Sequence, residues 1–93
     1  MTINTSTPAT SRILWHDVEP DQIKIDKLVS SMTQRRTVII SSPYEAPHCG
    51  VVNMIEAEDG SGHNFNINVA NMVKHTSETF YIDVHKVNIQ LIS

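Results

Sequence analysis

The chain has 93 residues, of which 40% are hydrophobic and 5% aromatic, and its formal net charge is −3. This length forms one domain with a small core and leaves no room for a second domain. A negative charge argues against wide contact with duplex phosphates, because small proteins with that function are normally basic. The single cysteine, Cys49, excludes an internal disulfide.

No run of apolar residues has the length of a membrane span. The first residues lack the basic start and apolar middle of a secretory signal. We therefore predict no membrane partner and a reducing, cytoplasmic location. A bacterial cytoplasm fits, either natively or during infection if the chain is phage-encoded.

The chain begins with residues 1–11, which are rich in Thr, Ser, Asn and Pro. This composition predicts a flexible tail ahead of a single domain at residues 12–93. A short apolar cluster that ends in Trp15 follows the tail. We interpret this tryptophan as a plug or lid on the core, with an exposed binding anchor as the alternative.

Residues 20–34 predict one amphipathic helix, because Pro20 suits the first helical turn and the apolar residues then recur at helical spacing. The apolar stripe consists of Ile25, Leu28, Val29 and Met32. Lys24 and Ser31 lie off this stripe. We expect the helix to cover one face or one open end of a sheet.

Residues 37–41 are β-branched and apolar, which is typical of a buried strand. Pro43 and Pro47 follow, and they bracket a segment of residues 42–48. Because proline cannot donate to a strand ladder, we predict that this segment is a loop without regular pairing.

Residues 50–70 predict two strands joined by a glycine-containing turn at residues 58–62. Past the turn, apolar and amide side chains alternate at period two, which places them on opposite faces of the strand. The apolar face contains Phe65, Ile67 and Val69, and the amide face contains Asn64, Asn66 and Asn68.

Residues 71–78 are compatible with a longer strand, a helical turn or a loop. Phe80, Ile82 and Val84 then share one face of a further strand. The apolar phase changes near His85, which indicates either a bulge or a tight turn between two strands.

These elements predict an α+β fold with one N-terminal helix and about five strands. Short connections between the strands favour antiparallel pairing. We therefore predict a small antiparallel, partly open β-barrel of the OB-like or SH3-like kind. A flat sheet with one helix packed across it is the alternative.

The amide face is the main candidate binding surface. Asparagine is a poor strand former, so hydrogen bonds to a partner are one reason for three of them in alternation. With Tyr81 on a paired strand and the basic pair Arg35 and Arg36, the amides resemble the stacking and hydrogen-bonding surfaces of single-strand binders. A plain solvated strand face is the simpler interpretation.

The histidines and the cysteine do not form a recognisable catalytic or metal motif. Asp83 and His85 share a strand face and can supply two ligands, but the other spacings do not match a zinc site. His48 and Cys49 are adjacent, which suits a nucleophile and its base poorly. We predict no metal, no cofactor and no enzyme activity, with a small hydrolase or metal-binding protein as a remote alternative.

The function that follows is recognition. We expect a small non-enzymatic accessory protein that binds another protein and associates with its own copies through a sheet edge. A nucleic-acid or nucleotide-binding barrel is the second hypothesis, based on Asn64, Asn66, Asn68 and Tyr81 with Arg35 and Arg36.

Overall fold

The computed structural model of the protein describes residues 19–92. One helix precedes five strands, which pair antiparallel in the order β4-β3-β2-β1-β5. The elements are α1 (Asp21–Gln34), β1 (Thr37–Ser42), β2 (Glu45–Ala57), β3 (Asn64–Asn71), β4 (Thr76–Asp83) and β5 (Asn88–Leu91). The predicted tail at residues 1–11 and the predicted role of Trp15 lie outside the described residues.

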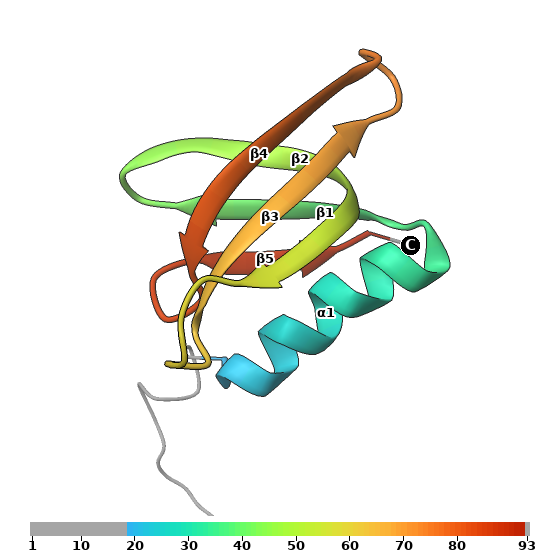
Figure 1. The fold of residues 1–93 in the computed structure, drawn as a ribbon. Coiled ribbons are helices and arrows are strands. Elements are labelled where there is room, and N and C mark those ends of the chain that lie inside the picture. The colour runs from blue at the N-terminus through green and yellow to red at the C-terminus, as the bar shows by residue number, and fades with distance from the viewer. Residues whose placement is uncertain (1–18, 93) are drawn as a thin grey trace, which may run out of the picture.

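The sheet curves over α1 without closing, because its outer strands β4 and β5 do not pair with each other (Figure 1). This arrangement confirms the predicted small α+β fold with a partly open barrel. The helix packs on β2, β5 and β1. Within residues 19–92, α1 is too short and too polar to cross a membrane.

Strand β2 bends because its two halves pair with different neighbours. The first half pairs with β1 as far as Val51, and the second half pairs with β3 from Val51 onward. A side chain at Gly50 would place its Cβ 2.6 Å from the carbonyl oxygen of Ala70. Glycine is therefore required where β2 passes closest to the end of β3.

A β-bulge at Asn53 shifts the alternation of β2, so that different residues point inward before and after it. Val52 pairs with Val69, whereas Met54 pairs with Asn68, so Asn53 is the extra residue of the bulge. The bulge explains why the period-two pattern of this strand is broken in the sequence.

The core is formed by side chains from all six elements. Ile67 and Ile82 are buried, and Phe65 and Phe80 pack against the buried cluster, which confirms the predicted inner faces of β3 and β4. The buried cluster consists of Leu28, Val38, Ile40, Val52, Ile67, Val69, Ile82, Val84 and Ile89.

The prediction of a loop at residues 42–48 is wrong, because β2 begins at Glu45 and includes Pro47. The β1–β2 register shifts between Ile40 and Ser42, so that Ala46 and Pro47 of β2 lie opposite the single residue Ser41 and form a bulge. Proline is tolerated at such a bulge, because no ladder hydrogen bond is needed from its nitrogen.

The expected stripe on α1 also needs correction, because Lys24 and Ser31 are buried whereas Val29 is 40% exposed. Each buried polar group has a partner in the sheet. The Lys24 ammonium donates to the carbonyl oxygen of Val84 at 2.6 Å. The Ser31 hydroxyl accepts the backbone N–H of Val52 at 3.0 Å. These bonds offset the cost of burying polar atoms. The helix is therefore rotated relative to the expected orientation, with the two polar residues toward the sheet and Val29 partly exposed.

The two segments that the sequence left open are turns. Residues 72–75 join β3 to β4, and the Asn71 carboxamide oxygen accepts the backbone N–H groups of Val73 and Lys74 there. The phase change near His85 is a turn rather than a bulge, since Lys86 donates its N–H to the carbonyl oxygen of Asp83. Strand β5 begins after it at Asn88.

Candidate functional site

Strand β4 forms one free edge of the sheet. The backbone N–H of Val84 donates to the carbonyl oxygen of His63 at 2.8 Å, which sets the alternation of hydrogen bonds along the β3–β4 ladder. In an antiparallel pair every second residue bonds to the neighbour, and the residues between point outward. The backbone groups of Ser77, Thr79 and Tyr81 therefore face the free edge.

Strand β5 forms the other edge and is more protected. The N–H of Ile92 donates to Thr37, so the same alternation points Ile89 and Leu91 outward. The Ile89 carbonyl oxygen already accepts a bond from the Lys27 ammonium at 3.1 Å. With four residues against eight in β4, β5 offers a shorter and partly occupied edge.

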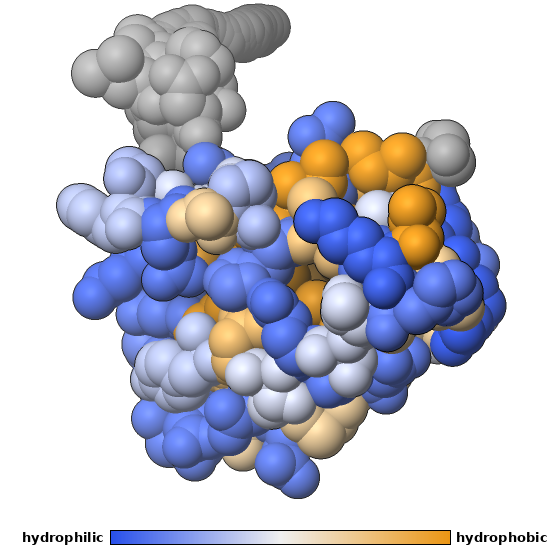
Figure 2. All heavy atoms as spheres, turned by 90° about the horizontal axis from the view of Figure 1, so that it is seen from above, coloured by the Kyte–Doolittle hydropathy of each residue, from blue (hydrophilic) through white to orange (hydrophobic). Residues whose placement is uncertain are grey.

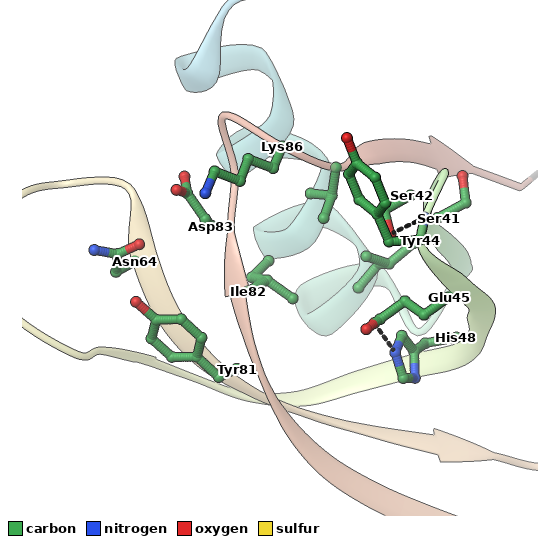
Figure 3. A pocket seen from close by; sticks show the side chains of 12 residues that line it. Ser41, Ser42, Tyr44, Glu45, His48, Asn64, Tyr81, Ile82, Asp83 and Lys86 are labelled. Carbon is green, nitrogen blue, oxygen red and sulfur yellow. Dashed lines mark hydrogen bonds and ion pairs between the residues drawn. The ribbon is translucent and has the colours of Figure 1, made fainter.

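A cavity of about 370 Å³ lies along the open side of the barrel, and we call it the seam pocket. Figure 3 shows Asn64 and Tyr81 on one side of it and Tyr44, Glu45 and His48 on the other. In the view of Figure 2, polar side chains cover most of the surface and apolar ones are visible in a central hollow. The pocket combines aromatic rings, a lysine and one side-chain amide in one solvent-accessible space.

His48 connects the β1–β2 hairpin to β4. Its ring stacks on Phe80, with centroids 3.8 Å apart, and its two nitrogens contact the carboxylates of Glu45 and Glu78. Partial burial opposes protonation, but the hydrogen bonds and the charges of both carboxylates outweigh it and raise the pKa of His48. Because both ring nitrogens are occupied, His48 does not activate the exposed thiol of Cys49.

The predicted amide face is held by hydrogen bonds within the sheet. The Asn53 amide donates to the Asn68 oxygen at 3.1 Å, and the Asn68 amide donates to Thr79 at 2.9 Å. We call this row across β2, β3 and β4 the polar ladder. Asn66 donates to Glu58 in the same way. These cross-strand bonds supply the stabilisation that the asparagines lack as strand formers.

Asn64 differs from the other two asparagines. Its amide nitrogen donates to Asp59 at 3.1 Å, while its carboxamide oxygen is buried and has no partner among the described residues. Asn64 lines the seam pocket, so this oxygen is an unsatisfied acceptor in the pocket wall.

Carboxylates surround this end of the pocket. Hydrogen bonds from the side chain and backbone of Ser61 lower the pKa of Asp59 to about 2. Desolvation, together with the charges of Asp59, Asp83 and Glu58, raises the pKa of Tyr81. Tyr81 is 53% exposed and pairs directly with Asn66, as the sequence suggested. The local charge is negative, which disfavours a phosphate group beside Tyr81.

The two arginines lie elsewhere. Arg35 ends α1 in the left-handed conformation, with φ of 58°, and Arg36 donates to the carbonyl oxygen of Ile92 at 3.2 Å. Both residues precede the first residue of β1, whereas the seam pocket lies at its last residues, Ser41 and Ser42. The structure thus brings Asn64 and Tyr81 into one pocket but not the arginines.

The sequence alone did not identify the pocket residues that the hairpins and turns supply. Glu45 and Glu78 reach His48 from opposite sides, although Glu78 is 30 positions away in the chain. Lys86 enters the pocket from the β4–β5 turn. No local pattern signals these contacts, because they depend on how the two hairpins fold toward each other.

Comparison of the chain with protein-family models, with curated proteins and with solved structures finds no significant match.

Proposed function

We propose that this protein is a non-enzymatic binding protein that works through protein–protein contacts, and that its β4 edge pairs with a second copy of the chain. The observation that carries the proposal is the outward-facing backbone of Ser77, Thr79 and Tyr81 on an eight-residue edge strand. An unpaired strand edge recognises another strand through main-chain hydrogen bonds.

The composition of β4 supports this function. Monomeric proteins protect an exposed edge with lysine, proline, a bulge or a very short strand. Residues 76–83 contain no lysine and no proline, and β4 pairs with β3 in continuous register over its whole length. The Glu78 side chain is engaged by His48, which reduces the negative charge that this edge presents to a partner.

A second copy of the chain is the partner that the sheet itself offers. Each copy carries a second unpaired edge at β5, at the opposite end of the same sheet. Because β5 is short and its Ile89 carbonyl oxygen is already occupied by Lys27, we expect β4 to pair with β4 of the second copy in a closed dimer. Pairing of β4 with β5 of the next copy would give larger assemblies, so the measured mass distinguishes the two arrangements.

The test compares Ser77→Pro with Ser77→Ala. Proline removes one outward N–H from the edge without touching the β3 ladder, whereas alanine keeps that N–H. We expect an oligomer by size-exclusion light scattering for the natural chain and for Ser77→Ala, and a monomer for Ser77→Pro with an unchanged circular dichroism spectrum. A natural chain that is monomeric at about 100 μM overturns self-association.

Nucleic-acid or nucleotide binding in the seam pocket is the second candidate. The unpartnered Asn64 oxygen beside Tyr81 favours it, because a base can donate to an amide and stack on an aromatic ring. The surrounding carboxylates oppose it. Binding of a labelled single strand is measured at two salt concentrations, and a phosphate-dependent complex weakens as salt rises. Tyr81→Ala should abolish such binding, and His75→Ala, at an exposed aromatic residue outside the pocket, serves as the control.

A further inference from the structure

A cluster of two histidines and an aspartate lies at the end of the sheet where β3 begins and β4 ends. His63 precedes β3, Asp83 is the last residue of β4, and His85 belongs to the β4–β5 turn. One nitrogen or oxygen atom from each side chain lies within 4.8 Å of the others. The two imidazole rings are stacked, with centroids 4.0 Å apart and planes inclined by 13°.

The aspartate is the centre of this cluster. Its Oδ1 atom lies 3.0 Å from His63 Nδ1 and 3.9 Å from His85 Nδ1. The backbone N–H of His85 donates to the same oxygen at 2.9 Å, which orients the carboxylate toward both rings. Burial opposes ionisation, but the hydrogen bonds from His85 and His63 outweigh it and lower the pKa of Asp83. The carboxylate is therefore ionised at neutral pH.

A second carboxylate lies beside the more exposed ring. Asp21 Oδ2, at the start of α1, lies 2.6 Å from His85 Nε2. This carboxylate favours the tautomer of a neutral ring with its proton on Nε2, which leaves the Nδ1 lone pair free for the cluster. Histidine ligands of metals characteristically donate their other ring N–H to a carboxylate in this way.

We propose that His63, Asp83 and His85 bind a divalent transition-metal ion of the zinc type through the two Nδ1 atoms and Asp83 Oδ1. Two imidazoles and one carboxylate suit zinc and its neighbours, whereas magnesium and calcium prefer oxygen ligands alone. Solvent access at His85, whose side chain is 52% exposed, leaves the fourth position to water.

The distances permit this coordination after small movements. Ligand atoms of a tetrahedral zinc site with bonds near 2.05 Å lie about 3.3 Å apart. The His63–Asp83 separation is already of this size, and His85 must approach Asp83 by well under 1 Å. The stacked rings must splay so that both lone pairs converge. His63 must also give up its contact with Asp83 and present the Nδ1 lone pair to the ion, so it binds as the tautomer with its proton on Nε2.

One neighbouring charge competes with the ion. Figure 3 shows the Lys86 ammonium directed toward the Asp83 carboxylate in the seam pocket. The positive charge of this lysine repels a cation bound at Asp83, so Lys86 lowers the affinity of the site. Removal of its charge is expected to strengthen binding several-fold.

The test titrates the full-length protein, first stripped with a chelator, with zinc and separately with cobalt(II). We expect one ion per chain by calorimetry and the intense visible absorption of a tetrahedral cobalt complex. His85→Gln should weaken binding at least tenfold, and Asp21→Asn should weaken it by about 10- to 100-fold although it is not a ligand. Lys86→Gln should tighten binding, an effect that a purely structural cluster would not show.

His75→Gln is the matched control, because His75 is an exposed histidine in the β3–β4 turn outside this cluster. Since His85 is half exposed, its variant should keep the fold, which circular dichroism checks. Histidine ring resonances add an independent measurement, in which zinc shifts His63 and His85 but not His75. Absence of binding at micromolar zinc, or equal binding by His85→Gln and the natural chain, overturns the proposal.

Discussion

The two edges of the sheet are held by different kinds of interaction. At β5 the helix covers the strand, and Lys27 bonds to the Ile89 carbonyl oxygen. At β4 the polar ladder through Asn68 and Thr79 joins the strand to β3, and His48 reaches it from the β1–β2 hairpin. One edge is thus stabilised by burial beneath a helix, and the other by polar side chains at the surface.

This difference explains why only one edge is suited to recognition. Burial under α1 uses part of the β5 backbone and leaves little room for a partner. Surface hydrogen bonds hold β4 to β3 without covering its outer side, so its backbone groups remain available. An edge strand that binds another strand must be held in place without its outer backbone groups. In β4 this is done by the pairing with β3 and by side-chain bonds on the face of the sheet.

The largest expected effect comes from removing the main contact of the helix. Leu28 is completely buried, so Leu28→Ala should destabilise the fold by about 2–5 kcal/mol. Urea denaturation measures this loss, and hydrogen exchange should show greater loss of protection in β5 than in β4. Val29→Ala, at an exposed position of the same helix, should cost about 0.5 kcal/mol or less. Equal loss of protection in β4 and β5 would contradict the claim that α1 stabilises mainly the β5 edge.

A smaller effect is expected at the polar ladder. Asn68→Ala removes the bonds to Asn53 and Thr79 together, and we expect a loss of about 1 kcal/mol. Hydrogen exchange should accelerate in β4 and not in β5, the reverse of the Leu28 variant. Ser77→Ala lies on the same strand without a side-chain bond and serves as the control. An Asn68 variant as stable as the control would show that the ladder does not hold β4.

The smallest effect is the pH dependence of His48. Its pKa is raised in the folded state, so its contribution is complete below the unfolded value of about 6.5. The contribution disappears as the pH rises through the folded-state pKa, because the protonated ring is what binds Glu45 and Glu78. His48→Gln should remove this part of the pH dependence of the free energy of unfolding, which amounts to about 1 kcal/mol or less. Urea denaturation between about pH 5.5 and 8.5 measures the change. An unchanged profile, with His75→Gln as the control, would exclude the two ion pairs.

The sequence alone determined the inner and outer faces of β3 and β4, the existence of the helix and the antiparallel, partly open sheet. Alternation along a strand is a property of the backbone, so Phe65, Ile67, Phe80 and Ile82 could be placed inside before any neighbour was known. The same alternation places Tyr81 on the outer face of β4, whereas its pairing with Asn66 depends on the register of the two strands.

The tertiary structure decided the features that depend on which strands meet. Pro47 lies in a strand because β2 bulges at this residue where it pairs with β1, and Asn53 forms a bulge because β3 pairs past it. Lys24 is buried because the end of β4 presents a carbonyl oxygen to it. His63 joins Asp83 and His85 for the same reason: the start of β3 lies beside the end of β4, although 20 positions separate His63 from Asp83. Composition and periodicity describe one segment at a time, whereas hydrogen-bond partners and side-chain clusters are properties of two segments brought together.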